Sequence, residues 1–484
     1  MVDRKHTGRS KRVVICGAGE AGEMIGREIV NNPRLAMELV AFLDDDPKKL
    51  WSEIHGVPVV GNNDDLRHVI TEYEVEEVLI AMPSASGDIA RKIIEECIAE
   101  EVAHRILPGV FEIIHGDAKI YQVRDVQVED LLKRDPIELD LSAITEEFEG
   151  RTILITGAGG SIGAELCRQL TPFKPEKLLL LGHGENSIFE IQNELARKFP
   201  DVPAVPIVGD IKDARKIEKV FEAYKPSIVF HAAAHKHIGL MELNIEEAVK
   251  NNVTGTRVMA EEAITHGASR FILISTDKAV NPASAMGASK MVAELVVQAL
   301  RYGNDTNFVT VRFGNVLESR GSVITVFKKQ IEMGGPVTVT DPEMTRYFMT
   351  VYEAVQLVVQ ASAIGEDGDI MILDMGLPIR IEELAKDLIR LSGYVPDKDI
   401  EINYIGMKHG ERLNEELIAS HESLTSTPIE QIMVVAPPSV DQYKILAQAA
   451  ALEKTAADMD KVLMLDILSQ LVPSYNPTEK AIND

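Results

Sequence analysis

The chain of 484 residues has few cysteines and no long apolar run, and each shortage argues against a class of protein. Its three cysteines, Cys16, Cys97 and Cys167, lie far apart without the spacing of a metal site, so we expect buried thiols in a reducing compartment. No run of about 18 apolar residues occurs, which predicts no membrane-spanning helix. The first ten residues are polar and lack the apolar core of a signal peptide, so we expect a cytoplasmic protein.

Basic residues are also scarce relative to acidic ones. The 50 Lys and Arg residues face 76 Asp and Glu residues, a formal net charge of −26. Such a charge repels phosphate backbones and anionic lipid, so neither a nucleic acid nor a membrane surface is an expected partner. The remaining composition, 45% hydrophobic and 26% charged, is typical of a globular protein, and the length predicts two or three domains.

Strands and helices alternate along the chain, and the alternation starts twice. Expected strands lie at residues 13–16, 39–43 and 78–81, and again at 152–155, 177–181, 204–208, 228–231 and 271–275. The pattern predicts an α/β protein with two Rossmann-like, doubly wound parallel-sheet domains. We place the first domain at 1–130, an acidic connector at 131–150, and the second domain at 151–440 with a small lobe largely after 312. A helical extension follows at 441–484.

A glycine-rich turn opens the first domain. Gly17, Gly19 and Gly22 lie between an expected strand and an expected helix, and Asp44 ends the next strand. These glycines allow a pyrophosphate to approach the helix N-terminus, and a carboxylate about 20 residues on can bind a ribose. The turn indicates a nucleotide site, although a Rossmann-like domain without a ligand explains it equally well.

A second turn, TGAGGSIG at residues 156–163, has the spacing of the cofactor turn in short-chain dehydrogenases. The residues expected to hold a dinucleotide here are Gly157, Gly159, Gly160, Ser161, Ile162 and Gly163. Later strand ends add Asp210 and Ile211 near an adenine ring, and Ala232, Ala233 and Ala234 as small residues beneath the cofactor. Glu185 can bind the ribose, and no arginine stands ready for a 2′-phosphate, so NAD is favoured over NADP.

The catalytic helix departs from the short-chain dehydrogenase pattern. Met286 stands at the tyrosine position of Tyr-x-x-x-Lys, and Lys290 keeps the lysine position. A thioether cannot carry a proton, so either the site is inactive or other residues transfer protons. Thr276, Asp277 and Lys278, at the end of the fifth strand, are residues of the required types.

This combination resembles the large bacterial UDP-N-acetylglucosamine 4,6-dehydratases of the capsular-polysaccharide family. Further matching segments are HAAAHKH at 231–237, RFGNVL at 312–317, SRGSV at 319–323, MTRYFMT at 344–350 and Gly-Glu at 410–411. The resemblance runs from about residue 12 to about residue 417. Longer family members usually carry N-terminal transmembrane helices, so this sequence is expected to be a soluble or shortened form.

The resemblance implies oxidation, elimination and reduction of one sugar. NAD takes hydride from C-4 of UDP-N-acetylglucosamine, the C-6 hydroxyl leaves as water, and the hydride returns to C-6. Thr276 would relay the 4-hydroxyl proton, Asp277 would protonate the leaving hydroxyl, and Lys278, beside Lys290, would remove the C-5 proton. Retention of configuration at C-5 is expected. A solvated Asp277–Lys278 ion pair is the alternative explanation.

The candidates for binding the sugar nucleotide are His237, Asn315, Arg320, Arg346 and Glu411. Arginine suits a diphosphate because its fork makes paired hydrogen bonds, although a salt bridge also explains each arginine. Glu318 stands where glycine is expected. His235 and His237 have no evident third ligand, so no metal site is predicted.

Two other functions remain open, and we expect a homo-oligomer in every case. An epimerase of the same superfamily would oxidise C-4 without losing water, but epimerases normally retain the tyrosine that Met286 replaces. A nucleotide-sensing protein with a disabled active site would also explain Met286.

Overall fold

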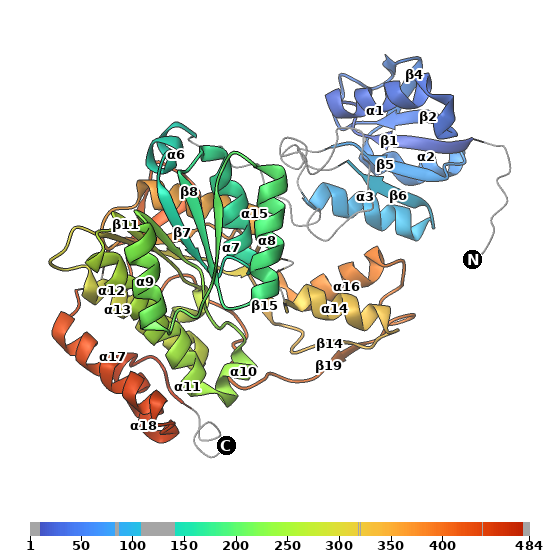
Figure 1. Ribbon diagram of the computed structural model, residues 1–484. Coiled ribbons are helices and arrows are strands. Elements are labelled where there is room, and N and C mark those ends of the chain that lie inside the picture. The colour runs from blue at the N-terminus through green and yellow to red at the C-terminus, as the bar shows by residue number, and fades with distance from the viewer. Residues whose placement is uncertain are drawn as a thin grey trace. The chain divides into compact units, whose positions relative to one another are not determined.

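A computed structural model describes residues 10–82, 87–107, 141–317, 319, 321–437 and 439–477. The chain divides into two compact units, residues 1–136 with 386–400, and residues 137–385 with 401–484 (Figure 1). Arg320, Glu318 and the first half of the predicted connector, residues 131–140, lie outside the described residues.

The first unit is built on a six-stranded sheet in the order β3-β4-β2-β1-β5-β6. Its strands are β1 (Lys11–Cys16), β2 (Met37–Leu43), β3 (Glu53–Ile54), β4 (Val57–Gly61), β5 (Glu77–Ile80) and β6 (Ala103–Ile106). Its helices are α1 (Glu20–Asn31), α2 (Leu66–Glu72) and α3 (Gly87–Ala99). Neighbouring strands are parallel except β3 and β4. Residues 13–16 of β1 are fully buried because helices cover both faces of the parallel sheet.

The second unit is built on a nine-stranded sheet in the order β20-β21-β17-β12-β11-β10-β7-β8-β9. The strands are β7 (Thr152–Thr156), β8 (Lys177–Gly182), β9 (Ala204–Val208), β10 (Ile228–His231), β11 (Arg270–Ile274), β12 (Asn307–Arg312), β17 (Ile370–Leu373), β20 (Leu424–Ser426) and β21 (Ile432–Val435). The expected strands and the Rossmann-like α/β class are confirmed. The sheet is parallel from β9 to β17, whereas β21 pairs antiparallel with β17 and β20.

Helices cover both faces of this sheet (Figure 1). One core contains side chains of α6 (Leu141–Phe148), α7 (Ser161–Leu170), α8 (Glu185–Lys198) and α15 (Val351–Ile364). The other contains side chains of α9 (Ala214–Tyr224), α12 (Gly255–Thr265) and α13 (Ala285–Leu300). Helix α9 shows how local sequence sets these elements: the Asp213 side chain caps its first turn, and Ile217, Val220 and Phe221 share its buried face.

The smaller elements lie in short sheets and single helices. They are β13 (Asn315–Val316) with β16 (Phe348–Met349), β14 (Val337–Val339) with β19 (Ile402–Tyr404), β15 (Thr345–Arg346) with β18 (Ile379–Arg380), and helices α10 (Ile238–Leu243), α11 (Ile245–Ala248), α14 (Val323–Glu332) and α16 (Ile381–Leu391). The sequence assigns most of the chain after residue 312 to a small lobe, but β17, β20 and β21 extend the main sheet instead. Their apolar residues complete its edge, as Ile370, Ile372 and Val435 pack together.

The start of the second unit differs from expectation. Residues 141–148, expected in the connector, form α6, and its Ile144 and Phe148 are buried in a core. The extension forms two helices, α17 (Gln442–Ala457) and α18 (Lys461–Leu471), whose apolar residues share a core with α13. Among the described residues, no helix combines the length and the apolar character of a membrane span.

Candidate active site

The sheet order brings the predicted cofactor and catalytic segments to one edge. Strands β7, β10, β11 and β12 are neighbours and parallel, so the loops after them begin at the same edge. These loops carry the glycine turn, the three alanines, the Thr-Asp-Lys run and Asn315. Ligands of open α/β sheets bind at this edge.

The turn after β7 has no room for side chains at its glycines. Gly157 has φ +64°, and a Cβ there would lie 3.0 Å from the backbone N and Cα of Ala233. A Cβ on Gly163 would lie 2.1 Å from the carbonyl oxygen of Gly157. Gly160 precedes α7 without a side-chain cap, and a helix N-terminus of this kind suits a pyrophosphate.

The other predicted cofactor residues surround this turn or follow the neighbouring strands. Glu185 is exposed at the first position of α8, and the backbone N–H of Ala233 donates to Thr156 Oγ1 at 3.1 Å. Asp210 Oδ1 accepts the N–H of Lys212 at 2.9 Å, and Ile211 is buried against Gly255. Ala232 is half-buried, and Ala234 is exposed.

Helix α13 holds Lys290 in a buried position. Its Nζ donates to the carbonyl oxygen of Ile274 at 2.8 Å, and burial lowers the pKa of Lys290 to about 8. Met286, one turn earlier, is 2% exposed and packs in an apolar cluster with Met241 and Ala248. The position that carries tyrosine in the resembling dehydrogenases is therefore apolar here.

The Thr-Asp-Lys run forms a compact cluster at the end of β11. Thr276 Oγ1 donates to Asp277 Oδ1 at 2.8 Å, and Lys278 Nζ donates to the same oxygen at 3.0 Å. Lys278 Nζ also donates to Asn315 Oδ1 at 2.8 Å. The cluster joins the end of β11 to the start of β13, and all four side chains can exchange or orient protons at one place.

Asp277 is fully buried, and one of its oxygens is unused. Within the described residues, Asp277 Oδ2 has no hydrogen-bond partner. Gly314 faces this oxygen, since a Cβ there would lie 3.4 Å from it. A buried carboxylate oxygen without a partner costs free energy, and such groups are rare in native structures outside functional sites.

Sequence reasoning missed two residues at the site. Asn252 lies in a π-helical segment, Val249–Thr254, and clamps the loop after β10: its Oδ1 accepts from the N–H of His235 at 2.8 Å, and its Nδ2 donates to the carbonyl of His235 at 3.0 Å. Its Nδ2 also donates to Ser289 Oγ at 3.0 Å, which ties the loop to α13. π-Helical segments often occur at functional sites, but the sequence period does not announce them.

Glu415 is the second residue that sequence reasoning missed. Its carboxylate oxygen Oε1 lies 3.8 Å from Lys278 Nζ and 3.6 Å from Arg346 Nε. Burial raises the pKa of the Glu415 carboxyl, the Asp277 carboxylate raises it further, and Lys278 and Arg346 oppose the rise. The pair Glu415 and Glu416, shortly after Gly410 and Glu411, was the available signal.

The predicted substrate residues separate into two groups. Asn315 and Arg346 lie at the cluster, and Arg346 is buried with its guanidinium donating to the carbonyl oxygens of Thr345, Leu413 and Arg412. Its hydrogen bonds therefore hold the 412–415 segment. Glu411 accepts the N–H of Lys408 in its own turn. His237 is exposed and lies against Gly321, where a Cβ would be 2.7 Å from its ring.

The profile of the family described as "Polysaccharide biosynthesis protein" matches residues 153–437, more than half of the chain. The chain belongs to this family. The capsular polysaccharide biosynthesis protein CapD of Staphylococcus aureus is 46% identical over 85% of this chain and 69% of its own length. The UDP-glucose 4-epimerase of Rickettsia massiliae is 34% identical over 57% of this chain and 80% of its own length.

A solved structure shows the same relationship in three dimensions. The X-ray structure of Pen from Bacillus thuringiensis is 31% identical, with a TM-score of 0.56, over 62% of this chain and 90% of that chain. The second unit of this chain thus has an extended short-chain dehydrogenase-type fold. A separate profile, described as a CoA-binding domain, matches residues 2–108.

The first unit of this family member has its own glycine turn. Gly17 has φ +100°, and a Cβ on Gly22 would lie 1.8 Å from the carbonyl oxygen of Gly17, whereas Gly19 faces open space. Asp44 Oδ2 accepts the N–H of Ala18 at 2.7 Å and Lys49 Nζ at 2.9 Å. Burial opposes ionisation of Asp44, but these bonds and the N–H of Asp46 lower its pKa. The expected ribose carboxylate is already bonded to the turn.

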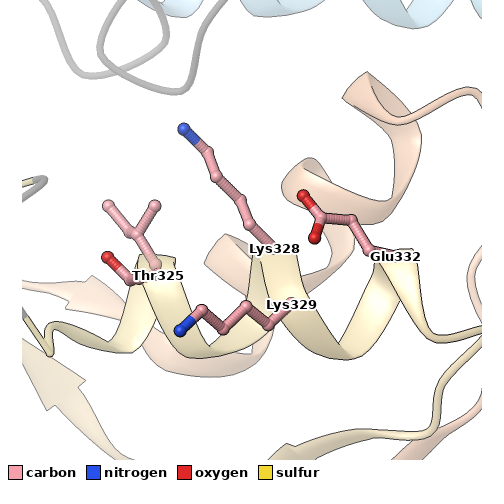
Figure 2. Close-up of a pocket in the computed structure, with 5 residues that line it drawn as sticks. Thr325, Lys328, Lys329 and Glu332 are labelled. Atoms are coloured by element: carbon pink, nitrogen blue, oxygen red, sulfur yellow. The ribbon is translucent and has the colours of Figure 1, made fainter.

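Concavity alone does not locate the active site. A hollow of about 360 Å³ lies along α14, lined by Ile324, Thr325, Lys328, Lys329 and Glu332 (Figure 2). It contains none of the clustered residues, so we place the site by its chemistry. No group of three or more His, Cys, Asp or Glu residues in the described segments is placed to bind a metal.

Proposed function

We propose that this protein removes water from UDP-N-acetylglucosamine to form a UDP-4-keto-6-deoxy-N-acetylhexosamine, a precursor for surface polysaccharide. The observation that carries the proposal is the Thr276, Asp277 and Lys278 cluster beside a helix with Met286 at the tyrosine position. An acid and a base adjacent to a relay hydroxyl suit an elimination, which a simple oxidation does not require. The identity to CapD supports the polysaccharide context.

NAD is the proposed cofactor. The turn at Gly157 and Gly163 is too crowded for side chains and leads into the N-terminus of α7, which suits a pyrophosphate, and Lys290 is buried on α13. NAD, when bound, supplies a hydride acceptor for C-4 and a hydride donor for C-6. Because no net oxidation results, we expect the purified protein to retain its NAD and to need no added cofactor.

The proton path follows the hydrogen bonds. As the 4-hydroxyl gives its proton to Thr276 Oγ1, Thr276 passes its own proton to Asp277 Oδ1, 2.8 Å away. The Asp277 carboxyl then protonates the C-6 hydroxyl, which leaves as water. Lys278 takes the C-5 proton and returns it to the same face, so configuration is retained. The sum is loss of one water, formed from the C-6 hydroxyl and the 4-hydroxyl proton.

A 4-epimerase is the second candidate, because a named epimerase is 34% identical to this chain. Epimerisation needs oxidation and re-reduction at C-4 but no acid for a C-6 hydroxyl. In that reaction Asp277 would only accept and return the 4-hydroxyl proton through Thr276, and Lys278 would have no C-5 proton to remove. A protein that only senses nucleotides needs neither an acid nor a base at this position.

One incubation separates these functions. With UDP-N-acetylglucosamine, mass spectrometry should show loss of one water; an isobaric product would indicate the epimerase, and unchanged substrate would contradict both enzymes. Asp277→Asn and Lys278→Met should each slow water loss by about 10²–10⁴-fold. Because Asp277 also accepts the 4-hydroxyl proton through Thr276, Asp277→Asn should slow C-4 oxidation as well as water loss, whereas Lys278→Met should keep C-4 oxidation and block the entry of solvent deuterium at C-5. Lys219→Met, on the exposed side of α9, is the matched control.

A further inference from the structure

Lys278 lies between the buried carboxylates of Asp277 and Glu415, and only Asp277 has a role in the proposed proton path. Asp277 Oδ1 accepts both Thr276 Oγ1 and Lys278 Nζ, which commits Asp277 to the hydroxyl proton. Glu415 Oε1 lies 3.8 Å from Lys278 Nζ, just beyond a direct hydrogen bond. A direct hydrogen bond between the two groups needs this distance to shorten by only a few tenths of an ångström.

The segment that delivers Glu415 is firmly held. Arg346 donates to the carbonyl oxygens of Arg412 and Leu413, and its Nε lies 3.6 Å from Glu415. The side chain of Glu415 is 3% exposed, and that of Lys278 is 17% exposed. A carboxylate at such depth loses much of its hydration, and this burial raises the pKa of Glu415 and favours its neutral form.

We propose that Glu415 is a positioning residue that acts through Lys278 by taking its spare proton. The step moves one proton from the Lys278 ammonium to the Glu415 carboxylate, and gives a neutral amine and a neutral carboxylic acid. No charge or co-reactant enters or leaves. The neutral amine can then accept the C-5 proton of the sugar. This inference rests on the proposed dehydration and adds the source of the active base.

Such an internal transfer has a signature in pH. The ion pair and the neutral pair hold the same number of protons, so their ratio does not change with pH while the pair stays intact. Without Glu415, Lys278 must lose its proton to solvent, and the reactive fraction then rises about tenfold per pH unit. The other charged groups near the pair are Asp277, Arg346, Arg412 and Lys236, and they are the same in each variant below.

The test compares Glu415→Gln with the parent over the neutral pH range. Glutamine has the same shape but cannot take a proton from lysine. Water loss and C-5 deuterium entry should fall by about 10²-fold or more, and both should rise steeply with pH. The absorbance of reduced nicotinamide should still appear at the parental rate, because C-4 oxidation does not use Glu415. Glu415→Asp should restore the flat pH profile at a reduced rate.

Glu416→Gln is the matched control, since the neighbouring Glu416 is exposed and accepts from Asn281 Nδ2 at 2.7 Å outside the cluster. It should behave as the parent. If Glu415→Gln loses activity with an unchanged pH profile, or loses C-4 oxidation equally, the role is structural and the inference is overturned. Parental behaviour in Glu415→Gln also overturns it. If the parent protein neither removes water from the substrate nor exchanges its C-5 proton, both the proposed dehydration and the role of Glu415 are overturned. Failure of the Glu415 inference alone therefore differs from failure of the proposed function.

Discussion

The glycine turn allows a sharp test of where the dinucleotide lies. Gly157→Ala places a Cβ on a residue with φ +64°, at 3.0 Å from the backbone N and Cα of Ala233. The left-handed conformation alone costs about 1–2 kcal/mol for a residue with a Cβ. Crowding against backbone that cannot easily move adds about 1–3 kcal/mol. We therefore expect the free energy of unfolding to fall by about 2–5 kcal/mol.

Gly150→Ala separates the two contributions. Gly150 has φ +67°, close to that of Gly157, but a Cβ there would meet nothing within 4 Å. This variant should lose only the conformational part, about 1–2 kcal/mol, and should keep its NAD. The difference between the two variants measures the crowding at the turn.

Two measurements decide the outcome. Denaturant unfolding of the second unit gives the difference in stability, and the NAD released on denaturation gives the bound fraction. Gly157→Ala should release much less NAD than Gly150→Ala, because shifting Ala233 disturbs the floor of the proposed site. Equal stability losses and equal NAD contents would refute the placement of the cofactor at this turn.

Two further predictions concern buried ionisable groups. Arg312→Met should lower the free energy of unfolding by about 3–5 kcal/mol, because Arg312 makes buried ion pairs with Glu294 at 2.7 Å and Glu422 at 2.8 Å, and its loss leaves both carboxylates without a partner charge. Denaturant unfolding of Arg312→Met, compared with Arg312→Lys, measures this loss. A near-neutral change in stability would contradict the prediction. Burial, aided by the charge of Lys290, lowers the pKa of His231 from 6.5 to about 3. Below about pH 6.5 the unfolded chain therefore gains a proton at His231, while the folded chain does not. The stability that the neutral His231 contributes is present above that pH and is lost as the pH falls toward 3. His231→Asn should reduce the slope of stability against pH by up to about 1.4 kcal/mol per unit in this window, and an unchanged slope in urea unfolding would rule out a neutral buried His231.

The parts of the site that were predictable are the local ones. Glycine turns, strand ends and the adjacent Thr276, Asp277 and Lys278 are set by short-range spacing, and the parallel sheet gathers them at one edge. Glu415 could not be found this way, because its distance from Lys278 is small only in three dimensions. The sequence also assigned Arg346 to a diphosphate, whereas its donors hold backbone carbonyl oxygens. Because every residue has a backbone carbonyl oxygen, the sequence does not indicate which of these oxygens will accept a hydrogen bond from an arginine.

The same reasoning explains how a helix without its tyrosine can serve the site. All but two of the 16 residues of α13 are buried. Helices α17 and α18 pack on one face of α13, which water would otherwise reach. Met286 packs in a separate apolar cluster with Met241 and Ala248, and Lys290, one turn later, donates to the carbonyl oxygen of Ile274. The proposed proton transfer uses Asp277 and Lys278 on the adjacent strand end, where Gly314 lies against the buried Asp277 oxygen that has no hydrogen-bond partner among the described residues. In the proposed reaction, α13 supplies Lys290 on the cofactor side and the end of β11 supplies the groups that transfer protons.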